Sequence, residues 1–537
     1  MVSQAFRDMI VELLPSQSEQ DNFFNSFQQP LKKSLSINRH RQQVASNKRQ
    51  ITSKDITTNN QDLETFEKNN PDFILSQTPF FEFEDTKYVD RDDTTLPLWK
   101  TRQHLTGQFY IQEVAAALPA NILKWYLQEL STLHSQPLTI LDLCAAPGGK
   151  TAQLADYLLK HNIPGIVRGN DVDAKRLSTW ATNIQRCGLY NTVASKLDGS
   201  QIGNLYPEFF DAILVDAPCS GEGTGFKSDA AYKRRTQESI NKIVGLQEHI
   251  VTSAIKACKV WGLVIYSTCT LNPFENEIQI KKLLEKYGDV LEILPIEVEN
   301  KSEGIVISDK FWVLSWQETS HSTLNTSHFL RARPHIHHTG WFFVCVMRKK
   351  SSTLKPLQTH ITHKKQSSLL SGKYTKAKSV TTPYSYNKQT ENNVKKILKE
   401  SFGIELDLNR YAIIEWKHKL NLTDASVREL VTWSVWFQEC GIPILKPTGK
   451  TFSLEHEIAL TLGHLATKNT IELTEDELQR YCLWEDIYSP LSRGLGGSYI
   501  HEPIKEVNGY YILTHNWLWV AIGKVIDNMI KNKFFKW

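Results

Sequence analysis

Between residues 100 and 350, short apolar runs rich in β-branched side chains alternate with longer helical patterns. This alternation is typical of βαβ units, in which helices connect parallel strands. The sequence therefore predicts an α/β core over 101–350, built on an open and mostly parallel sheet. We expect its strands at 139–143, 166–170, 193–197, 212–215, 263–266 and 341–346. We expect its helices at about 149–161, 173–187, 236–259 and 274–287.

The regions on either side of this core differ from it in composition. At 537 residues the chain is too long for one ordinary domain, so flanking modules are expected. Residues 1–100 are polar, with a helical pattern at 6–14 and a mixed apolar and basic patch at 30–39, and predict an N-terminal accessory segment. Residues 351–393 are rich in Ser, Thr, Lys and Gln, which indicates a flexible basic linker.

The segment 394–537 is expected to form a second folded region of mixed α and β structure. It is rich in aromatic residues and contains the hairpin-like sequence Val-Asn-Gly-Tyr at 507–510. Its last residues, KVIDNMIKNKFFKW, predict a terminal helix.

Composition excludes several classes of protein. No stretch approaches the roughly 20 apolar residues that cross a membrane, and the first residues lack the basic and apolar segments of a signal peptide, so we expect a cytoplasmic protein. The eight cysteines form no CxxC pair, which excludes zinc ribbons and disulfide frameworks, and we expect no metal. The net charge of +4 permits a nucleic-acid partner without requiring one.

The sequence Leu-Asp-Leu-Cys-Ala-Ala-Pro-Gly-Gly-Lys-Thr at 141–151 joins the first core strand to a helix. Small residues allow a ligand to approach the backbone, and the free amides of a helix start suit a polar ligand, so this segment predicts a cofactor loop. A P-loop is the rival interpretation, but Cys144 stands where its first glycine is required. A purely structural turn is the other.

Acidic residues follow the next two strands. Asp171 lies about 20 residues after the cofactor loop, the spacing at which an acid binds the ribose of a cofactor. Asp173 is the alternative for this role, and it also fits the acidic first position of the next helix. Asp198 follows the third strand and suits the exocyclic amine of an adenine. A solvated aspartate in a turn before Gly199 explains that position equally.

Two thiols and one carboxylate follow the fourth and fifth strands. Asp216 and Cys219 lie in Asp-Ala-Pro-Cys-Ser-Gly-Glu-Gly, and Cys269 lies in Ser-Thr-Cys-Thr-Leu-Asn-Pro-Phe-Glu-Asn-Glu. Because the carboxyl ends of neighbouring parallel strands line one crevice, these three side chains should converge beside the cofactor loop. Cysteines are also common as buried apolar filler, which is the alternative for either thiol.

Such a site suits addition chemistry on a pyrimidine ring. Carbon 5 of cytosine accepts a methyl group only after a nucleophile adds to carbon 6, and a thiolate does this well. An acid such as Asp216 would hold or protonate ring nitrogen N3, and the second thiol would help to release the enzyme.

Three segments, 142–151, 216–223 and 267–277, resemble the signature motifs of the Nop/Sun RNA cytosine-5 methyltransferases. The resemblance covers about 30–350 and implies a Rossmann-like class I core that uses S-adenosylmethionine. It implies Cys269 as the nucleophile, Cys219 as the thiol for product release, and Asp216 with Lys150 facing the base. It implies a cofactor site made of Cys144, Ala145, Ala146, Pro147, Gly148, Gly149, Lys150, Asp171, Asp198 and Asp216.

Within that family the chain is most similar to the bacterial branch that methylates 16S ribosomal RNA and carries a PUA-like C-terminal domain. Residues 441–460 carry that similarity, whereas the long linker and the Gly-Leu-Gly-Gly sequence at 494–497 depart from it. The resemblance implies a monomer that binds ribosomal RNA, naked or in the small subunit. The N-terminal segment is then an RNA-binding module.

Three other functions remain open from the sequence. A DNA cytosine-5 methyltransferase would use the Pro-Cys thiol, here Cys219, but the second thiol at Cys269 argues against it. A transfer RNA methyltransferase would share the whole site. A non-catalytic ribosome-assembly or RNA-binding factor would need no paired thiols beside a cofactor loop.

Basic side chains are candidates for RNA phosphate contacts, although each basic run fits a solvated face as well. The candidates are Lys32, Lys33, Arg39, Arg331, Arg333, Arg348, Lys349, Lys350, Lys531, Lys533 and Lys536, with Phe534, Phe535 and Trp537 beside the last three. The histidines at 335, 337 and 338 lack a Cys or acid at ligand spacing, so no metal site is expected there.

Overall fold

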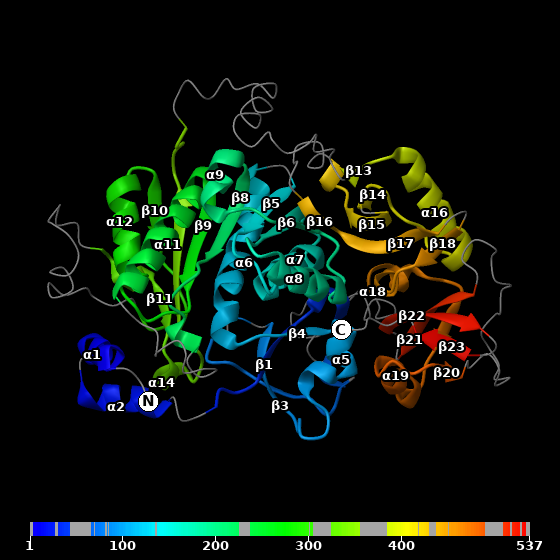
Figure 1. Cartoon of the computed structure of the whole chain (residues 1–537), viewed down its shortest axis with the longest axis horizontal. Coiled ribbons are helices and arrows are strands. Elements are labelled where there is room, and N and C mark those ends of the chain that lie inside the picture. Colours follow the sequence, from blue (N-terminus) through cyan, green and yellow to red (C-terminus); the bar gives the residue numbers. More distant parts are fainter. Residues whose placement is uncertain are drawn as a thin grey trace.

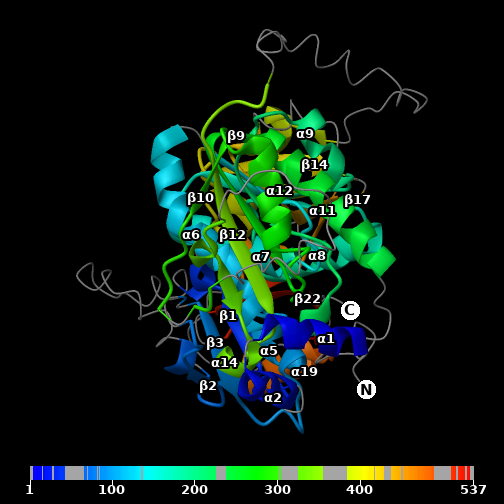
Figure 2. The same cartoon turned by 90° about the vertical axis from the view of Figure 1, so that its left-hand side faces the viewer.

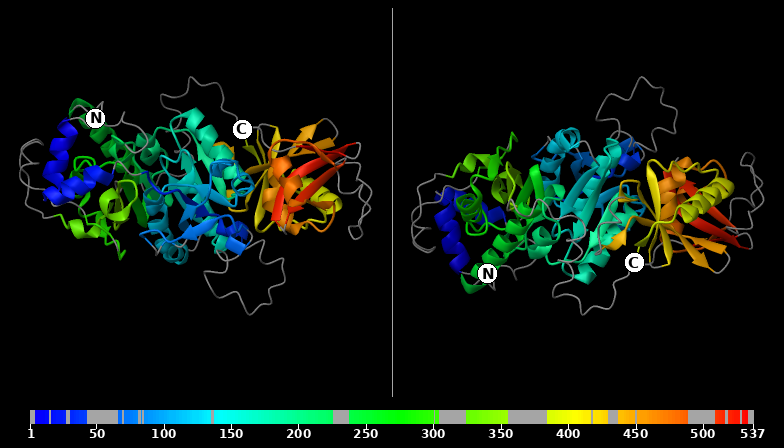
Figure 3. Two further views of the ribbon diagram at one scale, coloured as in Figure 1. Left: turned by 90° about the horizontal axis from the view of Figure 1, so that it is seen from below. Right: turned by 90° about the horizontal axis from the view of Figure 1, so that it is seen from above.

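The computed structural model describes most of the chain (Figure 1). The described residues are 4–14, 16–26, 30–42, 66–134, 137–224, 237–303, 324–354, 384–428, 437–448, 451–488 and 509–532, without 69, 81, 82, 84, 300, 417, 516, 517, 527 and 528. Seen from below and above, the C-terminal sheets lie at the end of the molecule opposite the first two helices (Figure 3).

A nine-stranded mixed sheet forms the centre of the molecule, with a path of β10-β12-β9-β8-β5-β6-β7-β16 and β11 paired to β12. Its parallel strands are β5 (Leu138–Asp142), β6 (Gly165–Asn170), β7 (Thr192–Ser195), β8 (Phe210–Asp216) and β9 (Cys258–Thr268). Its antiparallel strands are β10 (Leu291–Leu294), β11 (Leu330–Ala332), β12 (Phe342–Lys349) and β16 (Phe437–Cys440). The six strands expected from the sequence are confirmed.

Helices cover both faces of this sheet, which explains why its strands are apolar on both sides. One face carries α6 (Val114–His134), α7 (Gly149–Lys160) and α8 (Ala174–Arg186), and the other carries α9 (Ile202–Leu205), α11 (Gln237–Ala257) and α12 (Glu277–Tyr287). Figure 2 shows the strands between α6 and the α11 and α12 pair. Along β8, Leu214 packs in the first core and its neighbour Ile213 in the second. Among the described helices, none is long and apolar enough to cross a membrane.

The N-terminal part forms a small antiparallel sheet and a helical pair. The sheet has the order β2 (Ile74–Ser76), β3 (Thr86–Asp90), β1 (Ser34–Ile37) and β4 (Phe109–Ile111). The pair consists of α1 (Gln4–Leu13), which confirms the expected helix, and α2 (Gln17–Ser26). Ile10 and Phe23 of this pair pack against Leu271 and Trp341 of the core. The N-terminal part is therefore joined to the segment that follows the fifth parallel strand.

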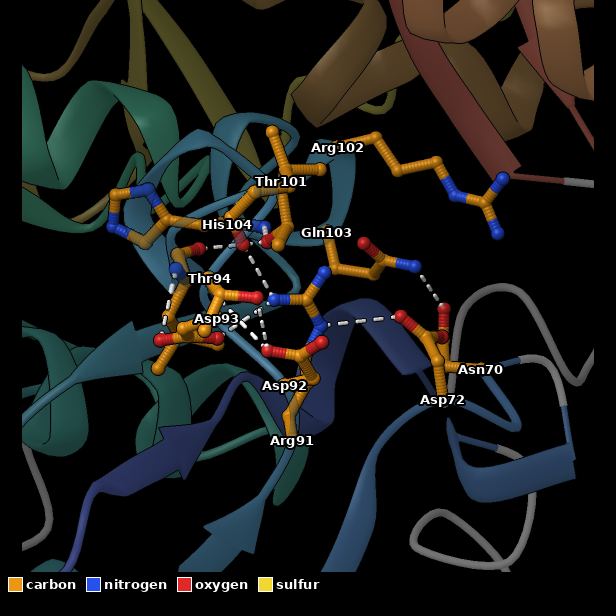
Figure 4. Close-up of polar contacts among 12 residues, drawn as sticks. Asn70, Asp72, Arg91, Asp92, Asp93, Thr94, Thr101, Arg102, Gln103 and His104 are labelled. Atoms are coloured by element: carbon orange, nitrogen blue, oxygen red, sulfur yellow. Dashed lines mark hydrogen bonds and ion pairs between the residues drawn. The ribbon is translucent and has the colours of Figure 1, made fainter.

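A polar network holds the segment between β3 and β4 (Figure 4). Arg91 pairs with Asp72 and Asp93 at 3.2 and 2.7 Å, and it donates to the Leu96 carbonyl at 2.7 Å. The short helices η1 (Leu98–Lys100) and α5 (Arg102–Leu105) follow. The Arg102 side chain points away from this network and pairs with Glu475, at the start of α19 (Glu475–Cys482). This segment thereby contacts the C-terminal part of the chain.

The C-terminal part contains two five-stranded sheets. The first is β13 (Tyr384–Ser385), β14 (Tyr411–Trp416), β15 (Lys419–Asp424), β17 (Ile442–Thr448) and β18 (Thr451–Leu454). The second is β19 (Thr470–Glu472), β21 (Tyr510–His515), β22 (Leu518–Ile526), β23 (Met529–Asn532) and β20 (Ile487–Tyr488). The helices α16 (Lys388–Phe402) and α18 (Glu457–Leu462) and the short η6 (Gly463–Leu465) accompany them.

The expected terminal helix is wrong over 524–526 and 529–532, which belong to the hairpin of β22 and β23. Ala521 packs into one core and its neighbour Ile522 into another, so the strand is buried on both faces. The spacing of apolar residues in a short apolar run does not distinguish a buried strand from a helix. Pairing with neighbouring strands decides the conformation of such a run. Residues 533–537 lie outside the described part, as do positions 507 and 508 of the expected hairpin, and the hairpin of β21 and β22 joins 515 to 518.

Glu457, near the start of α18, makes stability depend on pH. Its side chain is 1% exposed, and no other described residue donates a hydrogen bond to its carboxylate. Burial raises its pKa to about 8, above the value of about 4.5 in the unfolded chain. The native state therefore favours the protonated form, and the stability that this group contributes is lost as pH rises from about 5 through 8.

We expect Glu457→Gln to flatten this dependence, because the amide resembles the protonated carboxyl group and never ionises. At pH 9 its free energy of unfolding should exceed that of the wild type by about 2–4 kcal/mol. Thermal unfolding between pH 5 and 9 measures the difference, with the half-exposed Glu400→Gln as a matched control. Equal slopes for the wild type and Glu457→Gln would contradict the assignment.

Candidate active site

The loop between β5 and α7 begins and ends with buried anchors. The Asp142 carboxylate is 1% exposed and accepts a hydrogen bond from Thr151 Oγ1 at 2.6 Å, while burial raises its pKa to about 6. Trp180 Nε1 also donates to Thr151 Oγ1, at 2.9 Å. Gly148 precedes α7 with φ of +114°, a backbone conformation that L side chains rarely adopt. The loop is therefore fixed at both ends.

Asn170, the last residue of β6, holds three strand ends together. Its Nδ2 donates to the carbonyls of Leu143 and Leu197 at 3.1 and 3.0 Å, and its Oδ1 accepts from the Leu197 amide at 3.0 Å. Because these residues follow β5 and β7, Asn170 fixes the edge of the sheet at which ligands bind in open α/β folds. Sequence reasoning did not single it out.

Asp171 follows Asn170 and is 2% exposed. Its Oδ1 accepts from the Asp173 amide at 2.9 Å, whereas its Oδ2 accepts no hydrogen bond and lies 3.3 Å from Arg176 Nη1. Asp173 instead caps α8 by accepting from the amides of Lys175 and Arg176. The two acids thus differ, and only Asp171 keeps a buried carboxylate oxygen available for a hydroxyl donor.

Asp198 is exposed and begins the short helix η2 (Gly199–Gln201), where its Oδ1 accepts from the Ser200 amide at 2.9 Å. This contact is the one expected of an aspartate in a turn. A capping aspartate still has a second oxygen, so its contact with a cofactor stays a prediction.

The two expected thiols meet at the ends of neighbouring strands. Cys219 follows β8, Cys269 follows β9, and their Sγ atoms are 3.3 Å apart. Both side chains are partly exposed. The backbone amide of Gly223 donates to the Cys269 carbonyl at 2.8 Å, and a Cβ at Gly223 would lie 2.5 Å from that carbonyl oxygen. Only glycine allows these two loops to approach so closely.

A polar scaffold that sequence reasoning missed holds the two loops. Glu275 Oε2 accepts from the Ser220 amide at 3.0 Å and from Gln247 Nε2 at 2.9 Å. Gln247 Nε2 also donates to the Pro218 carbonyl, and the Ser220 and Thr270 hydroxyls are 2.7 Å apart. The motif around Cys269 contains Glu275, but nothing in the sequence marks Gln247 of α11, which comes from elsewhere in the chain.

Asp216 and Lys150 form an ion pair beside the thiols, with Asp216 Oδ2 2.6 Å from Lys150 Nζ. Asp216 Oδ1 accepts from Ser267 Oγ at 3.1 Å. Lys150 is 12% exposed and lies 5.4 Å from the centre of the Phe342 ring. Burial lowers the pKa of Lys150, but the Asp216 charge and hydrogen bond outweigh this effect and raise it. Lys150 is therefore a fixed cation that orients the carboxylate.

The surroundings of Cys219 and Cys144 raise the pKa of each thiol. The pKa of Cys219 lies well above its ordinary value, because Cys219 hydrogen-bonds to Cys269, is enclosed, and lies near Glu275 and Asp216. Burial likewise raises the pKa of Cys144 in the loop after β5. Cys219 and Cys144 therefore remain protonated at neutral pH.

Several basic candidates for RNA contacts are instead buried in ion pairs, so the expectation that they bind phosphates is wrong. Arg331 is fully buried and pairs with Glu277, and Lys349 is fully buried and pairs with Glu208. Arg39 is 2% exposed and pairs with Asp85. The sequence does not show whether a basic side chain faces water or pairs with a buried acid.

The remaining basic candidates lie nearer the surface. Arg333 pairs with Glu19 and Arg348 with Glu129, whereas Lys33 and Lys531 form exposed pairs with Asp93 and Asp486. Lys32 and Lys350 are exposed. Lys533 and Lys536, with Phe534, Phe535 and Trp537, lie outside the described residues.

The histidines after β11 pack against aromatic rings. His337 stacks on Phe80 at 5.1 Å, and His335 lies edge-on to Phe23 at 5.9 Å. Across the described ranges, no group of three or more His, Cys, Asp or Glu side chains has the arrangement of a metal site.

A parallel sheet with a glycine-rich loop after β5, a buried acid after β6, and a carboxylate with two thiols after β8 and β9 defines a Rossmann-like methyltransferase core. The model of the family "16S rRNA methyltransferase RsmB/F" matches residues 131–348. Ribosomal RNA small subunit methyltransferase F of Escherichia coli O1:K1 / APEC is 30% identical over 504 residues, covering 93% of this chain and 92% of that protein. This chain belongs to the RsmB/F methyltransferase family.

A second relative matches almost the whole length of this chain. Ribosomal RNA small subunit methyltransferase F of Vibrio parahaemolyticus serotype O3:K6 is 28% identical over 533 residues, covering 99% of this chain and 96% of that protein. Among solved structures, a methyltransferase homologue from Pyrococcus horikoshii matches 65% of this chain and 100% of that chain at 26% identity, with a TM-score of 0.45.

Proposed function

We propose that this protein transfers the methyl group of S-adenosylmethionine to carbon 5 of a cytosine in 16S ribosomal RNA. The observation that carries the chemistry is the pair of thiols, 3.3 Å apart, beside the Asp216 and Lys150 ion pair. The names of the relatives support ribosomal RNA of the small subunit as the substrate.

The residues present fit S-adenosylmethionine, which supplies the methyl group when bound. Asp171 Oδ2 is a buried acceptor without a hydrogen bond, as a ribose hydroxyl requires. The loop at 144–150 would lie along the methionine part. Asp198 would accept from the adenine amine through its second oxygen, and Asp216 would border the methyl group.

Cys269 would act first, because its thiolate adds to carbon 6 of the cytosine and forms a carbon–sulfur bond. The electron pair displaced from the ring makes carbon 5 nucleophilic, and carbon 5 then takes the methyl group. Asp216, held by Lys150 and Ser267, would hold the N3 edge and stabilise the proton there during addition.

Release requires loss of the hydrogen on carbon 5 and expulsion of the Cys269 thiolate. Cys219 lies in contact with Cys269 and keeps its proton while the enzyme is free. We propose that Cys219 assists this elimination by returning a proton to Cys269 as the carbon–sulfur bond breaks. A base removes the hydrogen from carbon 5 in the same elimination, and the electron pair of that carbon–hydrogen bond re-forms the double bond between carbons 5 and 6 and expels the Cys269 sulfur.

The flanking regions would hold RNA. We propose that 1–100 is an accessory RNA-binding segment, 101–350 the catalytic core, 351–393 a linker, and 394–537 a PUA-like RNA-binding region. The two five-stranded sheets and α18 support a β-rich module at the C-terminal end, which also adds β16 to the central sheet. We propose that the enzyme acts as a cytoplasmic monomer.

Asp171→Asn is expected to weaken binding of S-adenosylmethionine by about 10–100-fold, because a charged acceptor of the ribose hydroxyls becomes a neutral amide. Isothermal titration with S-adenosylhomocysteine measures the loss. Asp173→Asn preserves the α8 cap and serves as the matched control, with affinity within about twofold of the wild type. Equal losses in both variants would sink the assignment of Asp171.

Substrate choice is tested with purified protein, labelled S-adenosylmethionine and three acceptors: naked 16S ribosomal RNA, small subunits and bulk transfer RNA. Label in 5-methylcytosine from either ribosomal acceptor supports the proposal, and the preferred acceptor tells whether assembly is required. Label in transfer RNA alone would retain the chemistry and reject the ribosomal substrate.

A further inference from the structure

Arg41 is a buried cation in a pocket far along the chain from the thiols. It follows β1, is 7% exposed, and donates through Nη2 to the backbone carbonyl of Trp519 in β22. Its Nε and Nη1 atoms are also buried and donate to no acceptor. Burial lowers its pKa to about 10, which still leaves the guanidinium charged at neutral pH.

A second buried arginine lies close to the first. Arg186, at the end of α8, is 2% exposed and donates through Nη1 to the carbonyls of His104 and Phe109, while its Nε and Nη2 atoms have no acceptor. Its charge contributes to the lowered pKa of Arg41. Neither guanidinium pairs with a carboxylate in the described part of the chain. Two buried cations without a counter-charge are costly, and a bound anion removes that cost.

A small pocket, partly open to solvent, lies beside Arg41. His40 comes from the N-terminal part, Gly188 from the core, and Thr461 and His464 from the C-terminal part. Burial, together with the charges of His464, Arg410 and Arg41, lowers the pKa of His40 to about 3. The local field is therefore positive where three parts of the chain meet.

We propose that this pocket binds a small oxyanion of the phosphate type, with the Arg41 guanidinium as its main ligand. Nε and Nη1 of the Arg41 guanidinium have no acceptor, and a charged guanidinium donates its strongest hydrogen bonds to oxyanions such as a phosphoryl group. His40 and His464 also line the pocket. Since the ligand contacts all three parts of the chain, its binding stabilises their packing by mass action.

The test measures thermal unfolding of the full chain in inorganic phosphate, in sulfate and in chloride at equal ionic strength. At ten times the dissociation constant, phosphate should raise the Tm of the wild type by roughly 2 °C more than chloride does. Isothermal titration of phosphate should show about one site per chain. No effect of phosphate beyond that of chloride would overturn the proposal.

Three variants assign the site. Arg41→Gln should lose the rise in Tm with phosphate. His464→Glu should lose it too, but its Tm in phosphate-free buffer should be no lower than that of the wild type, because the new carboxylate replaces the anion. Arg428→Gln removes an arginine that already pairs with Glu391 and should keep the full response. If Arg41→Gln does not fold, His464→Glu alone decides. A normal response in His464→Glu would overturn the proposal.

The phosphate source is either a free ion or a phosphodiester of bound RNA. If saturating phosphate weakens RNA binding to the wild type but not to His464→Glu, the pocket takes an RNA phosphate. If RNA affinity is unchanged, the pocket takes the free ion. Both outcomes retain the site, and neither measurement depends on methyl transfer.

Discussion

Cys269→Ala is expected to abolish methyl transfer, with a rate at least about 10³-fold below that of the wild type. Without this thiolate nothing adds to carbon 6, and carbon 5 of an aromatic cytosine does not attack a methyl donor. Transfer of labelled methyl groups to 16S ribosomal RNA measures the loss. Binding of S-adenosylhomocysteine should stay within about twofold of the wild type, because Cys269 does not contact the ribose.

Cys219→Ala is the matched control, since it removes the neighbouring thiol at 3.3 Å. This variant should still form the covalent bond to carbon 6 but release product slowly, so protein linked to RNA accumulates and survives denaturing electrophoresis. The double variant Cys219→Ala with Cys269→Ala should give no such species. A covalent complex in Cys269→Ala, absent from Cys219→Ala, would reverse the two roles.

Arg331→Leu is expected to destabilise the protein by about 3–5 kcal/mol. Both members of the Arg331 and Glu277 pair are fully buried, and their two hydrogen bonds measure 2.7 and 2.6 Å. Removal of the arginine leaves an uncompensated buried carboxylate, which costs far more than the net contribution of the intact pair. Urea unfolding measures the difference in the free energy of unfolding.

Replacement of both partners separates this effect from lost packing. Arg331→Leu combined with Glu277→Leu should recover most of the stability, because no buried charge remains. Arg348→Leu breaks a more exposed pair with Glu129 and should cost less than about 1 kcal/mol. RNA affinity of folded Arg331→Leu should match that of the wild type. A selective loss of RNA affinity would restore Arg331 as a phosphate contact.

The central sheet and the thiol pair were predictable from sequence because their signals are local. Each strand is an apolar run, and each site residue follows such a run, so the rule that strand ends line one crevice places Asp216 with both thiols. Asp171 and Asp173 are two positions apart with similar surroundings in sequence. Only the structure shows that one carboxylate is buried and the other caps α8.

The remaining features depend on partners far apart in the chain. Gln247 meets Glu275 across 28 positions, Arg331 meets Glu277 across 54, and Arg41 meets Trp519 across 478. A polar or basic residue in sequence shows its charge but not its burial or its acceptor. The hairpin of β22 and β23 was missed for a related reason, because strand pairing decides the conformation of an apolar run that fits a helix equally well.

The most direct measurement is bisulfite mapping of small-subunit ribosomal RNA and bulk transfer RNA from cells with and without this gene. The proposed function predicts that one ribosomal cytosine loses protection when the gene is deleted. The wild type should restore that protection, and Cys269→Ala should not. Unchanged ribosomal RNA with a loss confined to transfer RNA, or rescue by Cys269→Ala, would contradict it.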